Sequence, residues 1–187
     1  MPLPASPTET GYSLWPRAAV IAAMIAFAAL SRLVPHPPNF TAVGAMAIFG
    51  GACLADRRLA LVVPLAALFL SDLFLGLHVL IPVVYGSFAL NVLLGRWLRP
   101  RRTVVTTAAV ALAGAVQFFV VTNFACWLLW YPHTGEGLVA CYVTAIPFFQ
   151  NTLLGDAAFA TALFGGLAVA DRGFPVLREP APAAIPA

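Results

Sequence analysis

The chain has 187 residues, of which 61% are hydrophobic and only 9% are charged. A soluble domain has about 25% charged residues, so this composition excludes an ordinary water-soluble globular protein. The net charge is +3, but the ten basic residues, all arginines, are dispersed over short segments rather than gathered on one face, which argues against nucleic acid as a partner.

Six apolar runs follow one another along the chain, each bounded by polar, glycine-rich or proline-rich segments: 17–34, 41–55, 59–75, 80–98, 103–122 and 147–170. A membrane span needs about 20 apolar residues, fewer where irregular chain completes the crossing. We therefore predict an all-α integral membrane protein with one six-helix transmembrane domain over 17–172. The proline-rich segments 1–16 and 173–187 are predicted to be disordered tails. No positive charge precedes Arg17, so the first run is predicted to be an uncleaved helix rather than a signal peptide.

The arginines set the predicted orientation. With both termini inside, nine of the ten arginines fall on the cytoplasmic side and Arg32 alone falls outside. Short loops rich in arginine remain in the cytoplasm, so we predict an N-in/C-in multi-pass protein.

The second run begins with an unusual polar stretch, PHPPNFTAVGAMAIFGG over residues 35–51. A helix over 41–55 would cover only about 22 Å of a core about 30 Å thick. The prolines favour extended backbone that completes the crossing. Asn39 or Thr41 is expected to cap the helix and leave amide groups that can meet an anionic ligand group.

Polar side chains collect toward the predicted outer side. Asp72 lies near the outer end of the third span, and Asp156 lies in the outer half of the sixth, below Asn151. A carboxylate at membrane depth is costly, so both aspartates are expected to face the bundle interior or water. The alternative is that each one reaches the interface or caps a neighbouring helix. The candidate substrate-binding residues are His36, Asn39, Asp72, His78, Tyr85, Asn123, Trp127, Tyr131, Asn151 and Asp156.

Residues 123–149 form a second predicted irregular segment on the outer side, rich in aromatic side chains. It is either a lid over a binding site or an interfacial aromatic belt. Cys126 and Cys141 lie within it and could form a disulfide in an oxidising compartment. The cysteines lack metal-ligand spacing and the three histidines lie in different loops, so we expect no metal and no cofactor.

Four blocks of the sequence resemble a known group of proteins: RLVPHPPNFTAVGAMAIFGG, VVPLAALFLSDLFLGLH, VYGSFALNVLLGRWL and IPFFQNTLLGDAAF. Together they look like an uncharacterised group of bacterial six-span membrane proteins labelled as transport proteins, over about residues 30–166. That group is similar, more distantly, to the S components of energy-coupling-factor (ECF) vitamin transporters. The resemblance implies the bacterial inner membrane, an ECF S-component-like bundle, and a binding role for His36, Asn39, Asp72, Asn151 and Asp156.

S components hold a vitamin on the outer side and are energised by an ATPase/transmembrane module, which they contact through small residues of the first helix. Here Ala18, Ala22 and Ala26 have the corresponding spacing. The chain has no Walker-type GxxxxGK[ST] sequence, so an ATP-driven motor would be another protein.

The leading functional hypothesis is therefore a substrate-binding transport subunit that captures a small polar molecule, such as a vitamin or corrinoid, beside the lipid bilayer. One alternative is a membrane scaffold in envelope biogenesis. The other is an intramembrane aspartyl protease, in which Asp72 and Asp156 would share a proton. The sequence reads LLGD rather than GxGD and has no convincing catalytic motif, so we expect no enzyme activity.

Overall fold

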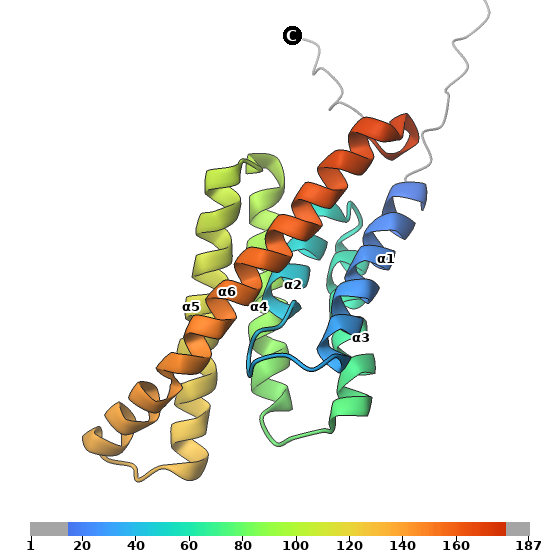
Figure 1. Ribbon diagram of the computed structural model, residues 1–187. Helices are drawn as coiled ribbons and strands as arrows, with labels where there is room; N and C mark the ends of the chain where they lie inside the picture. Colours follow the sequence, from blue (N-terminus) through green and yellow to red (C-terminus); the bar gives the residue numbers. More distant parts are fainter. Residues whose placement is uncertain (1–14, 179–187) are drawn as a thin grey trace, which may run out of the picture.

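The computed structural model describes residues 15–178, and all regular structure in that range is helical (Figure 1). The α-helices are α1 (Trp15–Leu30), α2 (Val43–Cys53), α3 (Arg57–Leu75), α4 (Ile81–Leu98), α5 (Val104–Trp130) and α6 (Gly135–Gly173). Short 3-10 helices follow α1, α4 and α6, at Ser31–Leu33 (η1), Arg99–Arg101 (η2) and Pro175–Leu177 (η3). The predicted tails at 1–16 and 173–187 fall mainly outside the described residues. Their inner edges are folded, because α1 starts at Trp15 and Leu177 is buried.

Five of the six helices are long and apolar enough to cross a membrane, and α2, with 11 residues, is shorter. No more than about a third of the side chains in each long apolar stretch is buried inside the protein. Large apolar side chains such as Phe27, Phe74 and Val104 are more than three-quarters exposed. Lipid is the solvent that stabilises such outer faces, so the architecture is that of a helical membrane protein.

The short helix α2 forms the centre of the bundle, and every residue from Val43 to Cys53 is buried. It contacts α1, α3, α4, α5 and α6. Glycines bring its backbone against that of α4. A Cβ on Gly95 would lie 2.2 Å from the carbonyl oxygen of Ile48, and one on Gly51 would lie 2.2 Å from that of Val92. Only glycine permits this close approach of two helices.

The first and last helices meet at one end of the bundle (Figure 1). There the guanidinium of Arg17 pairs with Asp171 at 2.5 Å and donates to the carbonyl oxygen of Leu177. We call this the basic end, because it also carries Arg57, Arg58, Arg96, Arg99, Arg101 and Arg102. The opposite end, called the loop end, consists of the connections 34–42, 76–80 and 131–134. The two described ends of the chain thus lie at the same end of the bundle.

The prediction of an irregular segment over residues 123–149 is wrong. Helix α5 continues to Trp130 and α6 starts at Gly135, so the connection has only four residues. Thr134 caps α6 by accepting a hydrogen bond from the amide of Gly137. Pro147, where the sixth span was predicted to begin, lies inside α6, because a long transmembrane helix tolerates the loss of one backbone hydrogen bond.

Candidate functional site

A cavity of about 370 Å³ lies in the loop-end half of the bundle. Side chains from η1, α2, α3, α4, α5 and α6 and from two connections line it. Five of the predicted site residues are among them, namely Asn39, Asp72, His78, Asn123 and Asp156. The sequence-based analysis therefore identified a set of residues that the fold brings to one place, and both intramembrane aspartates belong to it.

Asp72 forms a buried ion pair on one wall of this loop-end cavity. Its Oδ1 lies 2.7 Å from Nη1 of Arg32, and its Oδ2 accepts a hydrogen bond of 2.8 Å from the hydroxyl of Tyr85. The guanidinium also donates to the hydroxyl of Ser71. Tyr85 therefore holds the carboxylate of Asp72 in position, and it does not itself line the cavity. Charges inside a membrane pair with one another because an unpaired one is costly.

Arg32 was not among the predicted site residues, although the sequence contains a signal for it. It is the one arginine that the predicted topology leaves on the side opposite to the other nine. An isolated cation close to an intramembrane carboxylate indicates an ion pair more strongly than a loop position.

Asp156 belongs to α6 and lines the loop-end cavity beside the start of α2. Oδ1 of Asp156 accepts a hydrogen bond of 2.9 Å from the backbone amide of Ala45, and Asp156 as a whole is only 4% exposed. Ala42, the residue before α2, makes no side-chain cap. The prediction that Asn39 or Thr41 caps this helix is therefore wrong, and a carboxylate from α6 takes that position. One amide that was expected to meet an anionic ligand is thus used within the protein.

Asn39 instead shapes the loop before α2. The Phe40 amide donates to the Pro37 carbonyl oxygen, and Asn39 has a φ of 63°. A turn of this kind requires a positive φ at its third residue, which asparagine tolerates better than most side chains. Asn151 on α6 holds the loop in place by donating to the carbonyl oxygen of Pro38 at 2.9 Å.

The remaining predicted residues lie away from the cavity lining. His36 is exposed, and its ring nitrogens contact the backbone oxygens of Pro37 and Arg32. Trp127 Nε1 donates to the Pro132 carbonyl oxygen, and the Tyr131 hydroxyl contacts that of Thr144. These two aromatic side chains stabilise the turn between α5 and α6, and the structure gives no support for a lid.

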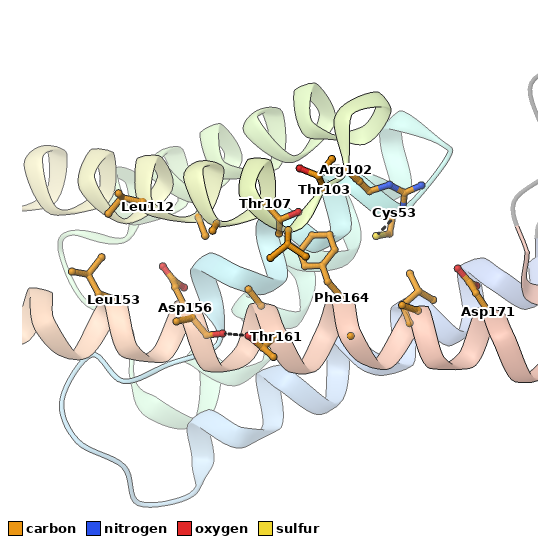
Figure 2. Close-up of a pocket in the computed structure, with 18 residues that line it drawn as sticks. Cys53, Arg102, Thr103, Thr107, Leu112, Leu153, Asp156, Thr161, Phe164 and Asp171 are labelled. Atoms are coloured by element: carbon orange, nitrogen blue, oxygen red, sulfur yellow. Dashed lines mark hydrogen bonds between the residues drawn. The ribbon is translucent and has the colours of Figure 1, made fainter.

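A second cavity, of about 780 Å³, lies between α5 and α6 toward the basic end (Figure 2). Its walls are mainly apolar, with Leu112 and Phe164 among them, and Arg102 and Asp171 lie at its basic end. Asp156 points from α6 toward α5 and lines both cavities. The carboxylate of Asp156 therefore lies where the two cavities approach each other.

The geometry does not resemble a protease dyad or a metal centre. Asp72 is engaged by Arg32 and Tyr85, whereas Asp156 is engaged by an α2 amide, so each carboxylate has its own partner. Across residues 15–178 no three histidine, cysteine or acidic side chains lie close enough together to hold a metal ion. Cys53, Cys126 and Cys141 are free thiols, so the structure does not contain the disulfide considered for the last two.

Residues 12–177 match a family of unknown function, DUF6580, and the chain belongs to that family. No curated protein and no solved structure matches the chain.

Proposed function

We propose that this protein is the substrate-binding part of a membrane transport system and captures a small polar molecule in the loop-end cavity. The observation that carries the proposal is the cavity itself, because a bundle with so apolar an exterior gathers a buried ion pair, a second carboxylate and several amides around one space of about 370 Å³. Polar groups are expensive inside a membrane and are typical of substrate pathways. The volume is also within the range of small-molecule sites.

The charges favour a polar ligand that is neutral or carries a positive group. Asp72 neutralises Arg32, so the cation has little remaining attraction for an anion. Asp156 uses Oδ1 for the Ala45 amide, and it brings no positive charge to the cavity. His78 and Asn39, both exposed, line the cavity near the loop end and are proposed to make the first contacts with the ligand.

The arginines of the basic end support a cytoplasmic location for that end, so the cavity would open to the outside of the bacterial inner membrane. An ATPase/transmembrane module is the proposed source of energy. Of the three alanines proposed to contact it, Ala26 is exposed, whereas Ala18 and Ala22 are half-buried.

Native mass spectrometry in mild detergent tests the proposal directly. The wild type is compared with His78→Ala and Asn39→Gly, which remove side chains at the cavity while the glycine keeps the positive φ of the loop. His133→Ala is the matched control, since His133 lies in the α5–α6 turn and does not line the cavity. We expect a small molecule to be retained by the wild type and the control and lost from the two variants.

Two results would contradict the proposal. A wild-type protein without a bound molecule, accompanied by stoichiometric membrane partners, would support the scaffold alternative. Retention of the same molecule by all four proteins would show that it binds elsewhere.

A further inference from the structure

The floor of the loop-end cavity contains a buried amide that the proposed function has not used. Asn91, in the middle of α4, lines the cavity and is only 1% exposed. Its Nδ2 has no hydrogen-bond partner, although nearly all buried polar atoms in proteins have one. Other buried atoms without a partner in the described part of the chain belong to Arg17, Ser87 and Gln117, and none of those residues lines this cavity.

The neighbours of Asn91 determine which end of its amide is free. Nε2 of Gln117 lies 3.0 Å from the backbone carbonyl oxygen of Ser87 and 3.0 Å from Oδ1 of Asn91. A backbone carbonyl only accepts hydrogen bonds, so Gln117 must present its NH2 group at this point. That NH2 group in turn requires an acceptor from Asn91, which therefore turns its oxygen toward Gln117. The unpaired end of Asn91 is consequently the donor.

Gly114 on α5 has no side chain, and the amide of Asn91 occupies the space that a side chain there would need. A Cβ at Gly114 would lie 2.8 Å from Oδ1 of Asn91, closer than side-chain atoms normally approach. The oxygen end of the Asn91 amide is thus held between the NH2 group of Gln117 and the backbone of Gly114, and Nδ2 is its unpaired donor. An unpaired buried donor is unfavourable, and a ligand acceptor would relieve that cost on binding.

The walls beside Asn91 are aromatic. Phe88 and Phe118 stack with ring centroids 4.9 Å apart, and Phe119 and Phe149 lie 4.6 Å apart. All four line the same cavity. Such surfaces favour flat π-systems in offset or edge contacts.

We infer that Asn91 is a ligand-binding residue, and that it donates a hydrogen bond from Nδ2 to a carbonyl oxygen of a flat heteroaromatic ligand. The inference rests on the proposed function and narrows it, because it assigns the class of molecule that the cavity takes. Polar substituents of the ligand would lie toward His78 and Asn39, and its carbonyl-bearing ring would reach the floor.

The test uses purified full-length protein and a panel of flat carbonyl compounds, namely nicotinamide, thymine, hypoxanthine and lumichrome. A thermal-shift screen selects the compound that stabilises the wild type most, and calorimetry measures its affinity for each variant. Asn91→Leu keeps the number and branching of the side-chain heavy atoms and removes the donor together with the acceptor that faces Gln117. Gly114→Ala displaces the amide of Asn91 without deleting it. This variant replaces Asn91→Leu in the test if Asn91→Leu fails to fold. Thr122→Val is the control, because Thr122 lines the same cavity and its hydroxyl already donates to the Phe118 carbonyl oxygen.

We expect Asn91→Leu and Gly114→Ala to weaken binding about tenfold or more, and Thr122→Val to leave it within about twofold of the wild type. Wild-type affinity in Asn91→Leu, with binding lost in His78→Ala, would overturn the inference and leave the capture function standing. A co-purified ligand without a flat ring carbonyl would do the same. If no probe binds and no molecule co-purifies, both the inference and the proposed function are wrong.

Discussion

The carboxylate of Asp156 on α6 caps α2 through the amide of Ala45, 111 residues earlier in the chain. A helix normally takes its N-cap from the residue immediately before it. Here the cap comes from a helix at the other end of the sequence, and the carboxyl group faces the positive end of the α2 dipole. One side chain thereby fixes the central helix, and the same side chain lines both cavities.

Substitutions of Asp156 test this long-range cap. Asp156→Asn keeps an oxygen that can accept from Ala45, whereas Asp156→Ala removes it. We expect the alanine variant to lose about 1–2 kcal/mol of stability and the asparagine variant to lose less, which is measured as unfolding midpoints in detergent. Equal midpoints for the two variants would show that the hydrogen bond to α2 contributes nothing.

The Arg32–Asp72 pair is expected to behave as a coupled unit. Arg32→Leu or Asp72→Leu alone leaves one buried charge without its partner, a change that costs about 3–5 kcal/mol in other proteins. The double variant removes both charges and is expected to be more stable than either single variant. A double-mutant cycle on unfolding free energies measures the coupling, and simple additivity of the two losses would contradict the buried pair.

Two glycines of α4 provide a matched test of the central packing. A Cβ at Gly95 would collide with the backbone of α2, whereas one at Gly86 meets nothing within 4 Å. We expect Gly95→Ala to lower the unfolding midpoint strongly. Gly86→Ala should leave the midpoint unchanged or raise it slightly, because alanine favours helix. A similar small effect at both positions would mean that α2 and α4 are not in close contact.

The start of α3 is expected to be sensitive to acid. The amides of Leu59 and Arg58 donate to Asp56 and hold the pKa of its carboxyl below the usual 3.8. A lowered pKa in the folded state stabilises the protein above pH 3.8, and the stabilisation is lost as the pH falls through the lower value. Asp56→Ala should therefore melt below the wild type at pH 6 and approach it near pH 3. A gap that stays constant over this range would exclude ionisation of Asp56 as the cause.

Cysteine labelling in whole cells tests the orientation. In a background in which Cys53, Cys126 and Cys141 are replaced by alanine, His133→Cys is expected to react with an impermeant maleimide and Arg101→Cys is not. Disrupted cells should label at both positions. The reverse pattern would place the cavity on the cytoplasmic side and contradict the proposed capture from outside.

The sequence predicted the helices well because their existence depends on apolar length, which is a local property. It also predicted that the second helix is too short to span, since that follows from the number of residues between Thr41 and Ala55. The beginning of α6 differs from the prediction, because the helix continues through Pro147 back to a cap at Thr134. In a membrane the remaining backbone hydrogen bonds outweigh the one that proline removes.

The site was predicted only in part, for a different physical reason. Composition and depth indicate that Asp72 and Asp156 must face the interior, but their partners depend on how distant helices pack. The contacts with Arg32 and Ala45 follow from helix rotations that no local pattern determines. Asn91 was not among the predicted site residues, whereas the structure shows that it lines the loop-end cavity.

The length and burial of α2 also constrain how the protein is made. A helix of 11 residues extends about 16 Å and cannot leave the translocon for lipid as an independent span. Its stable position exists only between α1, α3, α4, α5 and α6, and its capping carboxylate is synthesised more than a hundred residues later. Helix α2 is therefore expected to reach its packed position only after α6 has been synthesised. The loop-end cavity is completed only when α6 is in place, because Phe149, Thr152 and Asp156 of α6 form part of its lining.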